Sequence, residues 1–336
     1  MGILRRYLKC PALLLLPAAY GIFSYSIAVR AQDSPVNIQP RAVPGTTSTG
    51  SADRVTPHIR VNADLVLIPV MVTDHRDRLI TGLERGHFRV YEDKVEQAIT
   101  HFAADDVPVS ISLVFDCSGS MGAKLAKSKA AVKEFLRSAN PEDEFSLIQF
   151  ADNAQIVSPF TTRTEEIQNR LLYLQSKGRT ALLDAIYLAL DDMKNAKHAR
   201  KAILIISDGG DNSSRYSSRE VKRRVREADV QIYSIGIMES VMGRTRTLEE
   251  MDGPALLDDI AKQTGGRLFE VGDLNELSDV ATKIGAALRN QYVLGYAPAE
   301  PKHDGKYHRI QVKITRPAGV PPLRASFRTG YLAPAN

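Results

Sequence analysis

The chain contains 336 residues, and its hydrophobic (43%) and charged (25%) fractions are those of a folded protein with room for one sizeable core and a smaller module. The formal charge of +5 is concentrated in residues 1–31, which hold four basic side chains and no acidic one. The remainder has 44 − 4 = 40 basic against 39 acidic residues, a charge of +1 that argues against nucleic acid as a partner.

Residues 1–31 have the pattern of an export signal. Basic residues precede an uncharged stretch at 10–29, and small residues occupy the positions that a signal peptidase reads before a cut after Ala31. We therefore expect a signal peptide over 1–31 and a protein outside the cytoplasm, either secreted or in the periplasm or cell envelope. A stretch of about 20 uncharged residues also suffices for a single-span anchor. Retention as an N-terminal anchor is the alternative, and we expect contact with a membrane only in that case.

The next segments change from polar to β-rich. Residues 32–58 are rich in Pro, Ser, Thr and Gly and lack apolar periodicity, which predicts a flexible linker. Residues 59–106 contain strand-like apolar runs separated by turn residues and form an N-terminal β segment. Its predicted strands are 59–74, 87–90 and 98–102.

Residues 107–290 are predicted to form an α/β domain. Strand-like and helix-like segments alternate there, which indicates a parallel sheet with helices on both faces. The predicted strands are 109–115, 144–150, 154–157, 202–206, 231–237 and 267–271. The predicted helices are 123–138, 165–174, 181–194, 218–227, 254–264 and 274–288.

The first of these strands ends in the motif Asp116-Cys-Ser118-Gly-Ser120, which supplies one carboxylate and two hydroxyls. Thr180 begins a predicted helix, and Asp208 ends another predicted strand. Because ligands of open parallel sheets collect outside the carboxyl ends of the strands, we expect these five side chains to converge. Carboxylate and hydroxyl oxygens suit Mg²⁺, and Mn²⁺ or Ca²⁺ accept the same ligands. Thr180 is also expected to cap the helix that it precedes.

The chain returns to β character at 291–336, with strands predicted at 291–296, 308–315 and 325–331. Three strands at either end bury little alone, so we expect the N-terminal and C-terminal β segments to pair. The predicted fold class is α/β: a doubly wound, mainly parallel sheet inserted in a smaller β-rich module that both ends of the chain build.

Segments 113–121, 180–186 and 205–211 follow one another in the order of the von Willebrand factor A domain, which this part of the chain resembles. Over about residues 60–333 the chain resembles the bacterial VWFA-related domain group, and the domain itself is expected at 107–290. The segments that carry this wider resemblance are 62–66, 88–93, 264–269 and 291–296.

The resemblance implies a Rossmann-like sheet with a metal-ion-dependent adhesion site. It implies coordination of the cation by Ser118, Ser120 and Thr180. Asp116 and Asp208 would then bind the cation directly or through water. The resemblance further implies a protein partner that donates an Asp or Glu carboxylate to the metal.

Two loops, at 209–218 and 239–253, each follow a predicted parallel strand and are therefore expected on the same face as the metal. We expect these loops to select the partner, while the metal provides a common anchor for its carboxylate. The candidate partner-binding residues are Arg179, Gly210, Asp211, Arg215 and Tyr216.

The sequence thus favours an exported, divalent-metal-dependent protein-binding module of the adhesion type that is not an enzyme. A metal-insensitive scaffold component of the cell envelope is the alternative. A metal-assisted hydrolase ranks third, because Ser118 lacks a G-x-S-x-G context and no histidine base accompanies it. Cys117, which would be the sole cysteine after loss of residues 1–31, is expected to be a small buried residue.

Overall fold

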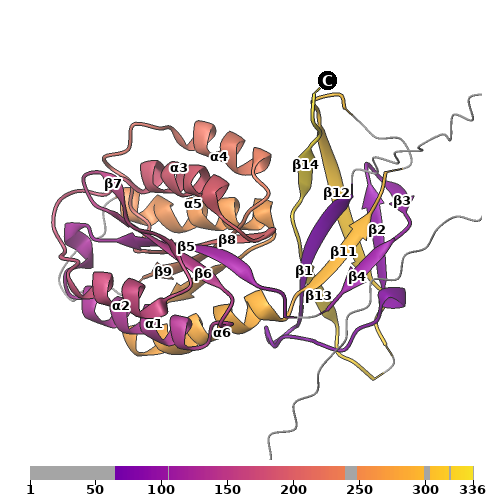
Figure 1. Cartoon of the computed structure of the whole chain (residues 1–336), viewed down its shortest axis with the longest axis horizontal. Coiled ribbons are helices and arrows are strands. Elements are labelled where there is room, and N and C mark those ends of the chain that lie inside the picture. The colour runs from indigo at the N-terminus through magenta and orange to yellow at the C-terminus, as the bar shows by residue number, and fades with distance from the viewer. Residues whose placement is uncertain (1–64, 105, 239–247, 299–302, 318, 336) are drawn as a thin grey trace, which may run out of the picture. The chain divides into compact units, whose positions relative to one another are not determined.

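The predicted signal peptide at 1–31 and the predicted linker at 32–58 lie outside the part of the chain that can be described. Within the described part, no helix has the length and apolar character needed to cross a bilayer. The computed structural model describes residues 65–104, 106–238, 248–298, 303–317 and 319–335 (Figure 1).

The α/β domain is built on a six-stranded sheet in the order β10-β9-β8-β5-β6-β7. Neighbouring strands run parallel except β7, which pairs antiparallel with β6 at one edge. Every residue of β5 is buried, because this central strand is covered on both faces. The prediction of a mainly parallel sheet is confirmed. The strands are β5 (Val109–Asp116), β6 (Glu144–Phe150), β7 (Ala154–Thr161), β8 (Arg200–Ser207), β9 (Gln231–Ile237) and β10 (Leu268–Val271).

Helices cover both faces of this sheet (Figure 1). Successive residues of a strand point to opposite faces, so Leu113 and Phe115 join one core and Val114 joins the other. The first core also contains residues of α1, α2 and α6, and the second contains residues of α3, α4 and α5, so the sheet is doubly wound. The helices are α1 (Leu125–Arg137), α2 (Thr164–Leu172), α3 (Leu182–Asp192), α4 (Ser218–Glu227), α5 (Leu248–Thr264) and α6 (Leu277–Arg289), and the 3₁₀ turns are η1 (Arg85–His87), η2 (Gly119–Met121), η3 (Met193–Asn195) and η4 (Leu274–Glu276).

Helix α5 begins at Leu248, earlier than the predicted start at residue 254. The residues before Pro254 are mostly strong helix formers, and the proline is accommodated inside the helix. Packing of Leu257 and Ile260 in the core favours the helix over a break at the proline. The loop predicted at 239–253 is therefore helical from residue 248 onward, and its first part lies outside the described residues.

The remaining strands form two four-stranded antiparallel sheets, in the orders β13-β1-β11-β4 and β14-β12-β2-β3, which we call the β module. Each sheet combines strands from both ends of the chain, since β1 pairs with β11 and β2 pairs with β12. The inner residues of the two sheets share one core. The prediction of a smaller β-rich module built from both segments is confirmed. The strands are β1 (Val66–Asp74), β2 (Phe88–Glu92), β3 (Val95–Gln97), β4 (His101–Ala103), β11 (Tyr292–Tyr296), β12 (Tyr307–Ile314), β13 (Leu323–Ser326) and β14 (Gly330–Leu332).

Two strand predictions in the β module are wrong in detail. The strand predicted at 98–102 is replaced by two shorter strands, β3 and β4. Asp93 and Lys94 have φ angles of 48° and 75° and turn the chain back directly after β2, so that β3 pairs with β2. The strand predicted at 325–331 is two strands, β13 and β14, which belong to different sheets. The chain crosses between the sheets where Thr329 donates a backbone hydrogen bond to the carbonyl of Gln263 at 3.2 Å.

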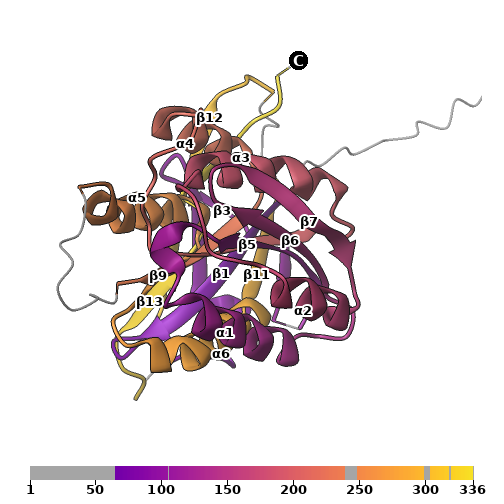
Figure 2. The same ribbon diagram turned by 90° about the vertical axis from the view of Figure 1, so that its left-hand side faces the viewer.

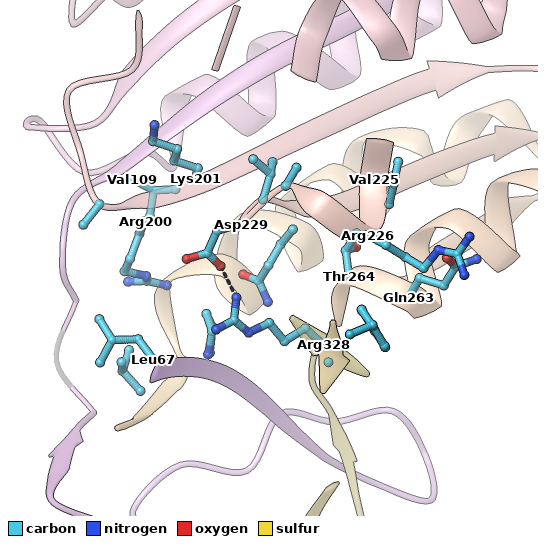
Figure 3. A pocket seen from close by; sticks show the side chains of 18 residues that line it. Leu67, Val109, Arg200, Lys201, Val225, Arg226, Asp229, Gln263, Thr264 and Arg328 are labelled. Atoms are coloured by element: carbon cyan, nitrogen blue, oxygen red, sulfur yellow. Dashed lines mark hydrogen bonds and ion pairs between the residues drawn. The ribbon is translucent and has the colours of Figure 1, made fainter. Parts of the chain in front are cut away.

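A cavity of about 70 Å³ is lined by both the β module and the α/β domain (Figure 3). Leu67 and Arg328 line it from the module, and Val109 and Thr264 line it from the domain. Arg328 donates a hydrogen bond to Asp229 at 2.6 Å across this space. Because Val109 is the first residue of β5, the cavity lies at the amino ends of the parallel strands, away from the end at which the predicted metal ligands lie.

Candidate metal centre

Asp116 is the last residue of β5, and its side chain is fully buried. Its Oδ1 accepts a hydrogen bond from the backbone nitrogen of Ser118 at 2.8 Å, and its Oδ2 accepts one from the hydroxyl of Ser207 at 2.6 Å. Ser207 is the last residue of β8, which runs parallel to β5, and β5 is labelled in the view of Figure 2. The two bonds fix the carboxylate at the carboxyl end of the sheet.

Ser118 and Ser120 lie in the turn that follows Asp116. Their hydroxyl oxygens are 3.0 Å apart, because the turn η2 folds the chain back directly after Ser118. The backbone nitrogen of Gly119 donates to the carbonyl of Gly178 at 3.0 Å, and a Cβ on Gly119 would lie 3.2 Å from the same oxygen. Glycine at position 119 therefore lets the loop with the two hydroxyls pack directly against the loop that carries Thr180.

Thr180 is buried in the loop before α3. Its backbone nitrogen donates to Oδ1 of Asn212 at 2.9 Å, and its carbonyl accepts from the backbone nitrogen of Asn212 at 2.9 Å. The N-cap of α3 is Ala181, which has no side-chain cap, so the prediction that Thr180 caps this helix is wrong. The helix starts one residue later than predicted, and capping does not occupy the Thr180 hydroxyl.

Asp208 directly follows β8 and has two differently placed oxygens. Its Oδ2 accepts a hydrogen bond from Nζ of Lys124 at 2.9 Å, in an ion pair whose side chains are 8% (Lys124) and 4% (Asp208) exposed. Its Oδ1 is buried and has no hydrogen-bond partner among the residues that the structure describes. Leaving a buried carboxylate oxygen without a partner is costly, so a cation at this oxygen would be strongly stabilising.

The electrostatics of the site also favour a cation. Burial and, second, the negative charge of Asp208 raise the pKa of the Asp116 carboxyl from 3.8 to about 7. A divalent cation near both carboxylates would hold both of them ionised. The candidate ligands are two carboxylates and three hydroxyls, with no nitrogen or sulfur, so the donor set fits Mg²⁺, Mn²⁺ or Ca²⁺ better than a soft metal.

Hydrogen bonds join the three segments that carry the predicted ligands. Contacts of Asp116 with Ser207 connect the ends of β5 and β8, and the contact of Gly119 with Gly178 connects the first loop to the loop of Thr180. The structure thus places all the predicted ligands in adjoining segments at one end of the sheet. They are Asp116, Ser118, Ser120, Thr180 and Asp208.

The residues predicted to contact a partner differ in their exposure. Arg179 and Arg215 are exposed, whereas Gly210 is buried. Tyr216 stacks on a tyrosine of α3, with ring centroids 3.9 Å apart, and Oδ1 of Asp211 accepts a hydrogen bond from a backbone nitrogen of the same helix at 3.3 Å. The two arginines therefore have the exposure that contact with a partner requires. Tyr216 and Asp211 instead hold the loop against α3, and Gly210 is covered.

Asp184 is an anchor of this loop that the sequence did not indicate, because it lies within an ordinary helical segment. Its Oδ1 accepts hydrogen bonds from the backbone nitrogens of Arg215 and Tyr216 at 2.8 and 3.2 Å. Its Oδ2 accepts one from Nε of Arg215 at 3.0 Å. One buried carboxylate on α3 therefore fixes the backbone of the loop beside the metal centre.

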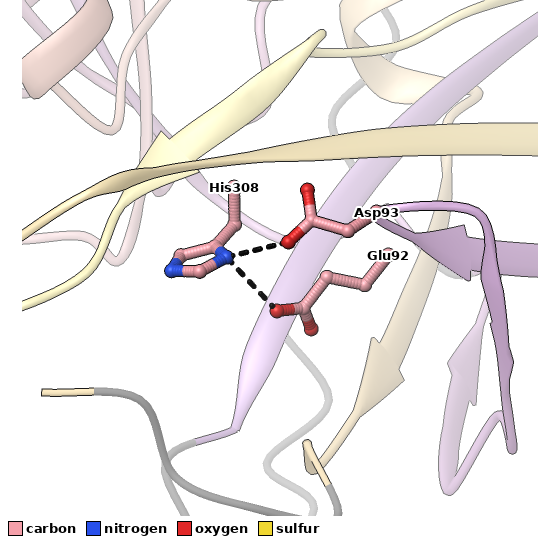
Figure 4. A group of neighbouring side chains, drawn as sticks. All are labelled: Glu92, Asp93 and His308. Carbon is pink, nitrogen blue, oxygen red and sulfur yellow. Dashed lines mark hydrogen bonds and ion pairs between the residues drawn. The ribbon is translucent and has the colours of Figure 1, made fainter. Parts of the chain in front are cut away.

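A second group of titratable residues lies in the β module (Figure 4). Nδ1 of His308 lies 2.7 Å from Asp93 Oδ2 and 3.6 Å from Glu92 Oε1, and its Nε2 lies 3.1 Å from Asp304 Oδ1. Carboxylates face both ring nitrogens, an arrangement that suits a protonated imidazole donating from both. We interpret this group as an ion-pair cluster that joins β12 to the end of β2.

Comparison with known proteins identifies the α/β domain. The sequence model of the von Willebrand factor type A domain matches residues 110–283, more than half of the chain. An uncharacterized protein of Borreliella burgdorferi is 31% identical over 184 residues, which cover 48% of this chain and 54% of the relative. Inter alpha-trypsin inhibitor heavy chain 4 of Mus musculus is 28% identical over 169 residues, which cover 46% of this chain and 17% of the relative. The chain thus spans about half, or less, of the length of these relatives.

Solved structures that resemble this chain include a von Willebrand factor type A protein from Catenulispora acidiphila. The comparison gives a TM-score of 0.48 and 14% identity, and it covers 81% of this chain and 75% of that one. The conserved hypothetical protein BatB from Bacteroides thetaiotaomicron has a TM-score of 0.42 and 21% identity over 53% of this chain and 98% of that one.

Proposed function

We propose that this chain, which belongs to the von Willebrand factor type A domain family, is an exported module that uses a divalent cation to bind a carboxylate of a protein partner. Domains of this family are often used for protein binding and commonly bind divalent cations. The observation that carries the proposal is the pair of buried carboxylates, Asp116 and Asp208, in segments that adjoin those of the three hydroxyl groups. One oxygen of Asp208 is buried without a hydrogen-bond partner among the residues that the structure describes.

The cation would be held by the hydroxyls of Ser118, Ser120 and Thr180 together with the two carboxylates. Mg²⁺ usually keeps part of its shell for water or an outside ligand, and it supplies a concentrated positive charge that attracts a carboxylate. The protein contributes loops fixed by hydrogen bonds to Asp152 and Asp184, together with the exposed arginines Arg179 and Arg215 that those loops carry. An Asp or Glu side chain of a partner has the chemistry to complete such a site.

We infer binding and not catalysis for this site. Within the described residues the hydroxyl of Ser118 is hydrogen-bonded to the hydroxyl of Ser120, and a serine hydroxyl is not the histidine base of a nucleophilic serine. Cys117 is buried, and burial raises the pKa of its thiol to about 12, which keeps it protonated. Neither side chain has the surroundings of an activated nucleophile.

Calorimetric titration of Mg²⁺ tests the proposal. The wild-type chain should bind the ion, and Asp116→Ala should not, with an unchanged circular dichroism spectrum. Asp279→Ala is the matched control, because it removes one exposed carboxylate from α6, far along the chain from the ligands. Equal binding by the wild type and Asp116→Ala would overturn the assignment of the site. A partner captured with Mg²⁺ and released by EDTA would support the adhesion role.

A metal-insensitive scaffold in the cell envelope is the second candidate, and one observation favours it. The buried ion pair of Lys124 and Asp208 neutralises one carboxylate of the site without any metal. A scaffold predicts association that EDTA leaves intact. Export itself stays a proposal, and mass spectrometry of the mature N-terminus tests it, with Gln32 as the first residue expected after cleavage.

A further inference from the structure

Lys124 is a buried cation inside the candidate metal centre that the sequence did not indicate. It precedes α1, its side chain is 8% exposed, and its Nζ donates to Oδ2 of Asp208. The other oxygen of Asp208, Oδ1, has no hydrogen-bond partner among the described residues. One carboxylate can therefore hold Lys124 through Oδ2 and a metal ion through Oδ1 at the same time.

The charge of the centre depends on this lysine. With both carboxylates ionised, Asp116, Asp208 and Lys124 sum to −1, and a divalent cation brings the sum to +1. Without the ammonium group the two carboxylates sum to −2, and the same cation brings the sum to zero. A buried site with an uncompensated charge is unfavourable, because water no longer screens that charge.

We propose that Lys124 makes metal binding at this centre conditional on a carboxylate ligand. The inference rests on the proposed function, and it adds how the metal and the partner depend on each other. With Lys124 in place, the metal-loaded centre carries an excess positive charge that the carboxylate of a partner neutralises. The lysine therefore weakens the binding of the metal alone and strengthens the binding of metal and carboxylate together.

The dependence must be reciprocal. If a carboxylate raises the affinity for Mg²⁺ by some factor, Mg²⁺ raises the affinity for that carboxylate by the same factor. A neutral side chain at position 124 gives a metal-loaded centre that is already neutral, and an added carboxylate then creates an excess negative charge. Loss of Lys124 should therefore raise the affinity for Mg²⁺ and remove its dependence on a carboxylate.

Calorimetric titration of Mg²⁺ into the whole chain tests this, once in chloride and once in acetate at the same ionic strength and with circular dichroism as the check on folding. The variants are Lys124→Met and Lys124→Gln. Glutamine keeps a hydrogen-bond donor for Asp208, so it serves as the variant that preserves the fold if methionine does not. Lys127→Met is the matched control, because it removes an exposed lysine from the first turn of α1, which directly follows Lys124.

The wild type and Lys127→Met should bind Mg²⁺ weakly in chloride and more tightly in acetate. The Lys124 variants should bind at least about tenfold more tightly in chloride, as removal of a nearby charge in a poorly screened site requires, and acetate should not improve them. Wild-type affinity in the Lys124 variants, or the same gain from acetate in all the proteins, would overturn the role of Lys124 alone. No binding by any protein in either anion would overturn the metal-dependent function as well.

Discussion

Metal-free protein should lose stability as the pH rises towards 7, because Asp116 must then ionise inside a closed site. Burial and, second, the charge of Asp208 raise the pKa of Asp116 from 3.8 to about 7. Below 3.8 the carboxyl is protonated in the folded and the unfolded chain and contributes no difference. Between the two values mainly the folded chain holds the proton, so a rise in pH favours unfolding.

The size of this effect follows from the shift in pKa. At about 1.4 kcal/mol for each pKa unit, a rise from 3.8 to about 7 corresponds to a loss of about 4 kcal/mol once the pH exceeds the folded value. This is a large share of the total stability of about 5–15 kcal/mol that is typical of a folded protein. The effect should therefore be visible in an ordinary unfolding experiment.

Asp116→Asn is the informative variant, because it removes the titrating group and keeps the shape of the side chain. Urea unfolding of both proteins in metal-free buffer, at about pH 4 and about pH 7.5, gives the difference in their free energies of unfolding. Other titrating groups are common to both proteins. The free energy of unfolding of the wild type should therefore fall by about 4 kcal/mol relative to that of Asp116→Asn as the pH rises. Added Mg²⁺ should restore stability at the higher pH in the wild type alone. The same pH dependence in both proteins would refute the reasoning.

Gly178→Ala should lower the free energy of unfolding more than Gly82→Ala. Both glycines have φ near +80°, so the backbone strain of the two substitutions is similar. A Cβ on Gly178 would lie 2.3 Å from the Asp152 carboxylate, whereas nothing lies within 4 Å of a Cβ on Gly82. Equal losses of stability in urea unfolding would contradict a steric cause. Tyr292→Phe should cost about 1–3 kcal/mol, because the hydroxyl accepts from a backbone nitrogen and donates to a carbonyl, each at 3.0 Å. An unchanged urea midpoint would argue against that contribution. The Cys117 thiol should react with a disulfide reagent at mildly alkaline pH only after unfolding, because the thiol is buried and burial raises its pKa to about 12. An equal rate of reaction in the folded chain would show that the thiol is accessible.

Elements with a strong local signal could be predicted from the sequence. The bounds of α4 match the prediction, because Ser217 and Glu220 form a capping box that marks the start of this helix within four residues. The fully buried strand β5 is mainly apolar, with two serines among its residues, and the Asp-x-Ser-x-Ser motif begins at its last residue. The fold class and the positions of the candidate ligands rest on signals of this kind.

Elements that depend on distant contacts could not be predicted in the same way. The early start of α5 requires packing that outweighs Pro254, and the turn after β2 places Lys94 at a positive φ, which lysine rarely adopts. The cap of α3 at Ala181 is set by Asn212, which fixes the preceding residue through two hydrogen bonds from a loop that lies far away in the sequence. In each case one local residue, namely Pro254, Lys94 or Thr180, favours another conformation, and the surrounding structure decides.

The candidate metal centre depends both on local motifs and on distant contacts. The sequence therefore indicates its candidate ligands but not the lysine that pairs with one of them. The candidate oxygen ligands are recognisable because they lie at the end of a strand, in the turn that follows it, or just before a helix. The charge that balances them comes from Lys124, a residue 84 positions away from Asp208 whose reach depends on how α1 begins. The type of the candidate ligands, which would select the class of metal, can therefore be predicted from the motif. In our proposal the affinity for that metal depends on a charge that only the folded chain brings into the site. Two chains with the same motif and different residues at the position of Lys124 should therefore bind the same class of metal with different dependence on a carboxylate.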